Sequence, residues 1–195
     1  MPLPVYYEQQ RLKGPPKKID PNGQVAHASE LLALGDGKFL VLARDSNRGR
    51  GLKSTESLYR HVDVVSVRGA TNIQARFDGY KSAYAPGGKL VSGVVPAKYC
   101  EFLDINVNAE LNRFMVQNGS PDELDFAKKG LLNEKWEGLA MMPVEGKKGE
   151  YFLFVSSDND FVTQDGRFNF GKDRYVDKMG IDLDNQHLVY KIKIE

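Results

Sequence analysis

The chain has 195 residues, of which 41% are hydrophobic and 27% are charged, and its formal net charge is +1. This length fits one domain with a well-filled core, or two small ones. A net charge this small creates no long-range electrostatic attraction to nucleic acid or to an anionic membrane, so we expect neither as a partner. No stretch approaches the run of about 18 apolar residues that a membrane-spanning helix needs.

The ends and the single cysteine add three expectations. Residues 1–24 are rich in Pro, Gly and Lys, which predicts an extended lead-in or linker. The first residues lack the basic and apolar regions of a signal peptide. This predicts a cytoplasmic protein if the chain is full length; alternatively, it is a trimmed piece of something longer. Cys100 excludes an internal disulfide framework, and its apolar neighbours predict a buried thiol.

The clearest structural signal is a hairpin that occurs twice. Apolar runs flank Asp36 and Gly37 within residues 30–43, and an Asp-Gly pair between apolar runs is a strong hairpin signal. The same order returns at residues 137–155, around a polar turn that contains two glycines. The sequence therefore predicts a repeated β-hairpin.

Each hairpin begins with a glutamate, Glu30 or Glu137, and is followed by an aspartate, Asp45 or Asp158. A loop and an alternating strand complete each copy, and the alternation at residues 59–67 predicts a strand with one face exposed to water. A repeated unit of this kind cannot bury both faces alone, so neighbours must stack on it. We therefore predict an all-β, propeller-like fold of stacked antiparallel blades over residues 25–195. The alternative is that the two hairpins match by coincidence, because any two β-hairpins share apolar strands and a glycine.

The middle of the chain is less regular. Residues 90–95 and 110–116 are predicted strands, and residues 96–102 are predicted to form one helical turn. Residues 122–129 are acidic early and basic late, which predicts a short surface helix. The basic residues at 44–53 are read as a solvated loop.

Several segments match, in order, a known family. The longest is the run Asn-Glu-Lys-Trp-Glu-Gly-Leu-Ala at residues 133–140. The others lie at residues 28–32, 42–45, 69–73, 103–106, 157–161, 182–186 and 188–194. Together these segments resemble the esterase-like phytase family, especially its fungal secreted members, over roughly residues 25–195.

That resemblance implies a propeller-like fold, secretion, and a hydrolase that acts on phosphate esters or other esters. Members of the family are usually much longer, so the chain is similar to a C-terminal portion with about four blades, at about 40–45 residues each. The implied partner is a small anionic or ester substrate.

Phosphate-ester hydrolysis needs the phosphate charge neutralised and a water activated, and hard cations on carboxylates supply both. Asp158, Asn159 and Asp160 follow the second hairpin, and Asp45 takes the matching place after the first. These four residues are a candidate Ca²⁺ site. It is not an EF-hand loop, and the alternative is that Asp and Asn at a strand end cap turns through their own backbone.

The catalytic candidates are Glu137, Asp158 and Asp160, which would hold the cation or the water. Glu30 and Glu137 have a structural alternative, in which a repeated glutamate ties adjacent sheets through an arginine such as Arg44.

The substrate-binding candidates are Arg44 for an anion, Trp136 for a sugar ring, and His27, the one histidine near these residues. A lone tryptophan in a β core is more often packing. The chain has no Gly-x-Ser-x-Gly elbow, which argues against an α/β-hydrolase esterase. A non-catalytic β scaffold that binds a carbohydrate, a small ligand or a protein partner is the alternative function.

Overall fold

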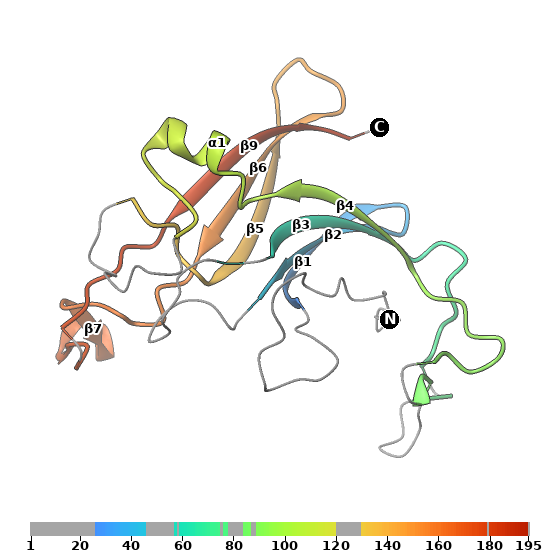
Figure 1. The fold of residues 1–195 in the computed structure, drawn as a ribbon, viewed down its shortest axis with the longest axis horizontal. Helices are drawn as coiled ribbons and strands as arrows, with labels where there is room; N and C mark the ends of the chain where they lie inside the picture. The colour runs from blue at the N-terminus through green and yellow to red at the C-terminus, as the bar shows by residue number, and fades with distance from the viewer. Residues whose placement is uncertain are drawn as a thin grey trace.

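The computed structural model describes residues 26–45, 57, 59–74, 76–77, 84–86, 89–119, 130–178 and 180–194. Its strands pair antiparallel in two larger sheets and one short ribbon (Figure 1), which confirms the predicted all-β class. These residues do not close into a ring of blades. The predicted lead-in at 1–24 and the predicted helix at 122–129 lie outside the described part of the chain. No helix in the described part is long and apolar enough to cross a membrane.

The first sheet is a four-stranded antiparallel meander in the order β1-β2-β3-β4. Its strands are β1 (His27–Gly35), β2 (Lys38–Arg44), β3 (Arg60–Ser66) and β4 (Lys98–Asp104). Each strand pairs with the next along the chain, so β4 is an edge strand.

The second sheet has the order β5-β6-β9, with β5 at Trp136–Pro143, β6 at Glu150–Ser157 and β9 at His187–Lys193. A two-stranded ribbon, β7 (Gly166–Phe168) and β8 (Asp173–Tyr175), lies between β6 and β9 in the sequence and projects from the sheet (Figure 1). The first three strands of each sheet therefore follow the same plan of a hairpin and a third antiparallel strand.

Both predicted hairpins are present. Asp36 and Gly37 have φ values of 57° and 71°, the left-handed pair that a tight hairpin turn with the right twist requires. The longer second turn contains Gly146 and Gly149, at φ 69° and 76°. A β-bulge marks the start of the first strand in each hairpin, between Ala28 and Glu30 in β1 and between Trp136 and Gly138 in β5.

The core lies between the two sheets. Alternate residues of β2, β3, β6 and β9 point into it, and β5 contacts both β1 and β2. Its buried members are Leu40, Leu42, Val62, Ile105, Leu111, Leu132, Trp136, Leu153, Val155 and Ile192. The period-two pattern of the strands thus gives each sheet one face for this shared core.

Three predictions for the middle of the chain are wrong. Residues 110–116 contain the end of α1 (Asn108–Leu111) and the 3-10 turn η2 (Asn112–Phe114) instead of a strand, because Leu111 and Val116, five residues apart, are the ones that pack on the core, which is not the period of two of a strand. Residues 96–102 lead into β4 instead of a helical turn, because β3 offers an unpaired edge there. Residues 90–95 form no strand.

Two burial predictions are also wrong. The outer face of strand β3, which the sequence predicts to be exposed to water, is covered. Asp63 and Val65 point away from the main core and are only 0% and 4% exposed. Val67, Ala70 and Ala97 pack beside Val65 and help to cover that face. Cys100 is exposed rather than buried, because it lies on the edge strand β4.

Candidate functional site

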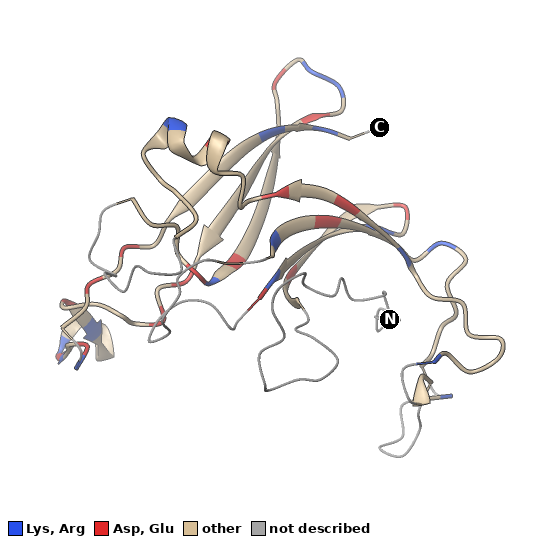
Figure 2. Ribbon diagram, in the orientation of Figure 1, with Lys and Arg blue, Asp and Glu red and all other residues tan. Residues whose placement is uncertain are grey.

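The predicted site residues of both hairpins lie at one end of the two sheets, which we call the junction end and define by Arg44, Asp45, Trp136 and Glu137. Strand β2 finishes there and β5 starts there. Along the described part of the ribbon, Lys and Arg are interspersed with Asp and Glu (Figure 2). The chemistry of the junction end therefore depends on local contacts.

Arg44 and Glu137 form an ion pair between the two sheets. The Nη2 atom of Arg44 donates to Oε1 of Glu137. Only 10% of the Arg44 side chain is exposed, against 34% of the Glu137 side chain. Glu137 occupies the bulge of β5, which turns its side chain toward the first sheet. This is the contact that the structural alternative for the repeated glutamate anticipates.

Asp45 is part of a buried network on the other side of Arg44. Its Oδ1 atom accepts the hydroxyl of Ser57 at 2.7 Å, and its own amide donates to the carbonyl of Tyr59. Asn118 donates to the Ser57 carbonyl and accepts the Ser57 amide at 2.9 and 3.0 Å. Asp45 is 1% exposed, so the carboxylate serves the packing of this loop.

Arg60 is the residue of this network that the sequence analysis missed. It is fully buried opposite Arg44, and Nη1 donates to Oδ1 of Asn106 and of Asn118 at 3.2 and 3.0 Å. Burial lowers the pKa of its guanidinium to about 10, against the opposing attraction of Asp45. Arg60 alternates with Val62 and Val64, which face the core, so the period-two pattern of β3 is the signal that could have identified it as inward-facing.

The candidate Ca²⁺ ligands after β6 are engaged in turns. Oδ1 of Asp158 accepts the Asp160 amide at 2.8 Å, and Oδ1 of Asn159 accepts the Phe161 amide at 3.1 Å. Oδ2 of Asp160 is 2.6 Å from Nζ of Lys135. No group of three or more His, Cys, Asp or Glu side chains suited to a metal occurs among the described residues. As placed, these oxygens do not fit a Ca²⁺ site, and calcium stays a prediction.

The remaining candidates lie near the same end but do not converge. Trp136 is fully buried, and its Nε1 donates to the Asn133 carbonyl at 2.7 Å, so it packs and cannot stack on a sugar. Glu30 is exposed and accepts the amide of Leu31 at 2.8 Å. His27 is exposed and lies opposite Arg44 in the register of β1 and β2.

A second buried polar cluster, on the outer face of the first sheet, was also missed. Tyr59 donates to Oδ2 of Asp63 at 2.7 Å, and Tyr99 donates to the same oxygen. His61 stacks on Tyr59, with ring centroids 3.9 Å apart. Its ring nitrogens are 3.4 Å from Asp63 Oδ1 and 3.5 Å from Asp104 Oδ1.

The surroundings of these side chains shift the pKa values of His61, Tyr59 and Tyr99. Burial disfavours the charged form of His61, but Asp63 and Asp104 outweigh it and raise the pKa of the imidazole. Burial and Asp63 also raise the pKa of Tyr59 and of Tyr99 well above the usual range. These two phenols stay protonated and act as donors to Asp63.

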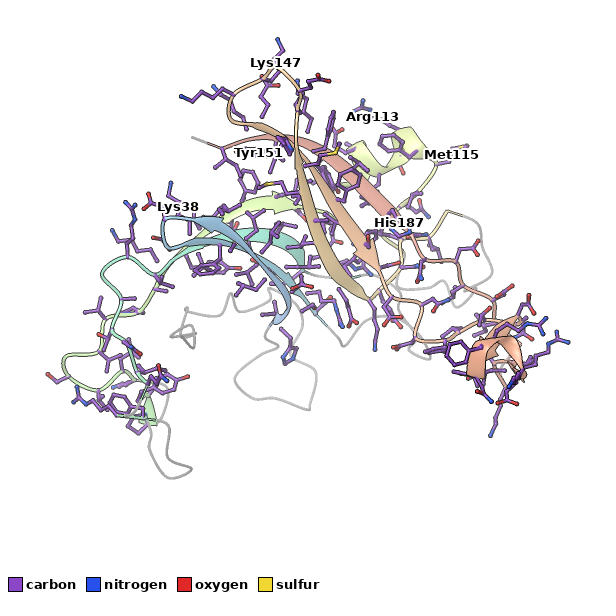
Figure 3. All side chains as sticks on the ribbon, turned by 180° about the vertical axis from the view of Figure 1, so that it is seen from behind. Lys38, Arg113, Met115, Lys147, Tyr151 and His187 are labelled. Carbon is purple, nitrogen blue, oxygen red and sulfur yellow. The ribbon has the colours of Figure 1, made fainter. Side chains whose placement is uncertain are left out.

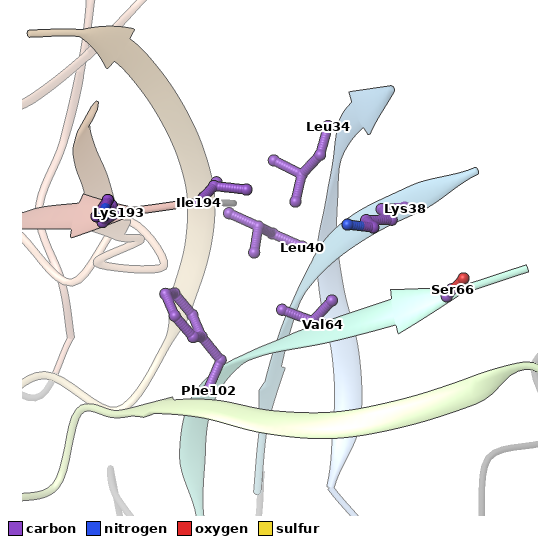
Figure 4. Close-up of a pocket in the computed structure, with 8 residues that line it drawn as sticks. All are labelled: Leu34, Lys38, Leu40, Val64, Ser66, Phe102, Lys193 and Ile194. Carbon is purple, nitrogen blue, oxygen red and sulfur yellow. The ribbon is translucent and has the colours of Figure 1, made fainter. Parts of the chain in front are cut away.

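A cleft of about 240 Å³ opens at the opposite end of the sheets, beside the hairpin turns. We call this the hairpin end. Figure 3 places Lys38 and Tyr151 there, away from His187 at the other end of the second sheet. The described lining residues are Leu34, Lys38, Leu40, Val64, Ser66, Phe102, Lys193 and Ile194 (Figure 4).

Comparison with known proteins gives one relative. The chain is 41% identical over 169 residues to an uncharacterized secreted protein of Arthroderma benhamiae. The match covers 76% of this chain and 31% of that protein, so the chain spans about a third of the length of its relative. No protein-family model matches the chain, and no solved structure matches it.

Proposed function

We propose that this chain is a stretch of a secreted, propeller-like β protein, and that its junction end is scaffold rather than a hydrolytic site. The observation that carries the proposal is that each carboxylate there has a partner within the protein. Asp45 accepts from Ser57, Glu137 pairs with Arg44, and Asp158 caps its own turn. A group that holds a cation or activates a water must direct its lone pairs at that ligand, and these contacts direct one oxygen of each carboxylate to the protein itself.

Two further observations support the larger architecture. The face of the second sheet that points away from the core exposes Met142 and Val189, at 51% and 54%, and the half-buried Phe152 and Phe154 lie on the same face. An apolar sheet face of this kind calls for a covering layer. The relative is about three times as long as the matched stretch, which leaves ample chain for further sheets, and its description supports secretion.

Ester hydrolysis is the second candidate function, with one observation in its favour. Arg44 and Glu137, which the sequence places in different repeats, meet at the junction end with about a third of the Glu137 side chain exposed. An anionic substrate that displaced Glu137 from Arg44 would find the guanidinium already positioned. The resemblance to the esterase-like phytase family supports the same reaction.

The experiment that separates the two functions measures phosphate release from phytate and from an aryl phosphate, with Ca²⁺ or with EDTA. The variants are Asp158→Ala, just after β6, and, as an exposed carboxylate for comparison, Asp184→Ala, just before β9. The scaffold proposal predicts no release from any protein. It also predicts that Asp158→Ala lowers the free energy of unfolding by about 1 kcal/mol, equally in Ca²⁺ and in EDTA, because a turn cap is lost.

Calcium-dependent release that disappears in Asp158→Ala and survives in Asp184→Ala would overturn the scaffold proposal. It would establish Asp158 as part of a hydrolytic site.

A further inference from the structure

The cleft at the hairpin end has an apolar interior built by both sheets. Leu34 and Leu40 come from the first hairpin, Val64 and Phe102 from β3 and β4, and Ile194 from the chain just after β9. These side chains converge on one space in Figure 4. Contact between the sheets at this end is incomplete, because the side chains that would meet there leave about 240 Å³ unfilled.

The charged group that faces the cleft is Lys38, whose ammonium points toward Leu40 (Figure 4). Ser66 adds a hydroxyl, and none of the described lining residues is acidic. Lys193 also borders the cleft, but it alternates along β9 with the core-facing Ile192 and Ile194, so its side chain belongs to the outer face of the second sheet. Lys38 also takes part in another interaction, so an anion would share it. An apolar pocket with an ammonium group at its edge is complementary to a molecule with an apolar body and an anionic head.

The size of the cleft limits the body of that molecule. Its volume is below the roughly 300–1,000 Å³ of sites that take drug-sized ligands. A short acyl chain or a single ring fits this scale.

We propose that the cleft between the hairpin ends binds a small amphipathic anion, a short-chain or single-ring carboxylate, with its body on Leu40, Val64 and Phe102 and its charge on Lys38. This site is separate from the junction end. Six residues separate Lys38 from Arg44 along β2, which corresponds to about 20 Å in an extended strand. The binding therefore does not depend on whether the junction end is scaffold or hydrolytic.

The test is a titration followed by the methyl NMR signals of the folded chain, with three probes of one length: hexanoate, hexanamide and hexylammonium. Hexanoate is expected to shift the Leu34, Leu40, Val64 and Ile194 methyl signals saturably. The dissociation constant should be on the order of 1 mM, because a ligand of so few atoms buries little surface. Hexanamide should bind about fivefold more weakly, and hexylammonium should give no saturation.

The variants assign the binding to the cleft. Lys38→Gln is expected to weaken hexanoate binding about fivefold, whereas Lys193→Gln, on the outer face of the second sheet, and the exposed turn variant Lys147→Gln should leave it unchanged. Leu34→Phe and Val64→Phe fill the space and should abolish the binding of all three probes. Two filling variants are used so that one misfolded protein does not decide the result.

Three outcomes would overturn the proposal. One is the absence of saturable shifts at the cleft methyl groups. Another is equal binding of hexanoate and hexylammonium. The third is a loss of affinity in Lys147→Gln as large as that in Lys38→Gln.

Discussion

The junction end and the hairpin end belong to the same pair of sheets but are built in opposite ways. At the junction end the gap between the sheets is filled by Trp136 and closed by the Arg44–Glu137 pair, with Arg60 and Asp45 buried beside it. At the hairpin end the sheets leave an open apolar cleft with lysines next to it.

Under the scaffold proposal, the repeated motif marks structure and not chemistry. The repeated glutamate and aspartate draw attention to the junction end, yet their side chains bind other parts of the same chain. The hairpin end has no polar motif, yet it keeps unfilled space and groups that can meet a ligand. Of the recurring charged residues, Glu137 joins the repeats through Arg44, whereas Glu30, Asp45 and Asp158 bond within their own repeat.

The largest expected effect comes from truncating the filled end. Trp136→Ala should lower the free energy of unfolding by about 3–5 kcal/mol, because it empties a fully buried site and removes the hydrogen bond to Asn133. Leu34→Ala, at the open end, should cost only about 1 kcal/mol, because its side chain already borders free space. Chemical denaturation measures both, and equal costs would contradict the distinction between the two ends.

A double-mutant cycle tests the link between the sheets. Arg44→Met and Glu137→Gln should show a coupling energy of about 1–2 kcal/mol, because Arg44 is nearly buried. The control is the exposed pair Arg113–Glu110, with side chains 67% and 64% exposed, whose coupling should stay below about 0.5 kcal/mol. If the two cycles give the same coupling, Arg44 and Glu137 do not hold the sheets together.

The smallest effect is a pH dependence that arises from the polar cluster on the outer face of the first sheet. The His61 pKa is raised in the folded chain by Asp63 and Asp104 despite burial, and Tyr59, Tyr99 and Glu101 complete its surroundings. Because the folded pKa exceeds the unfolded value of about 6.5, this stabilisation is complete below that pH and is lost as the pH rises through the folded value.

The measurement is the free energy of unfolding between about pH 6 and about pH 9. His61→Gln should remove this part of the slope, and His187→Gln, which alters an exposed histidine bonded to Ser156, should keep it. An unchanged slope in His61→Gln would show that the acidic neighbours do not hold the charge on His61.

The hairpins could be predicted from the sequence because their signals are local. Asp36-Gly37 between apolar runs encodes its own turn, and the polar turn with Gly146 and Gly149 does the same. Strand β4 could not be predicted in this way, because its pairing partner β3 lies more than 30 residues earlier. The helical turn at Leu111 depends on a core that other segments build.

For the site, the sequence indicated which charged residues flank the hairpins and named Arg44 as a partner for a repeated glutamate. It gave no sign that Arg60 donates to Asn106 and Asn118 or that Asp63 accepts the amide of Phe102, because these partners are distant in the chain. The cleft could not be predicted from the sequence either. It is a space between two sheets, and no local sequence pattern indicates how far apart two sheets pack.

The most direct test of the difference between the two ends uses one substitution at two positions of β3. Val62 and Val64 point to the same face of the sheet; Val62 is fully buried, and Val64 lines the cleft. Val62→Ile should lower the free energy of unfolding by about 1–2 kcal/mol, because a packed core resists an added methyl group. Val64→Ile should leave it unchanged or raise it by up to about 1 kcal/mol, because the methyl group enters free space. Equal destabilisation by the two substitutions would show that the hairpin end is as closely packed as the core and would contradict the account.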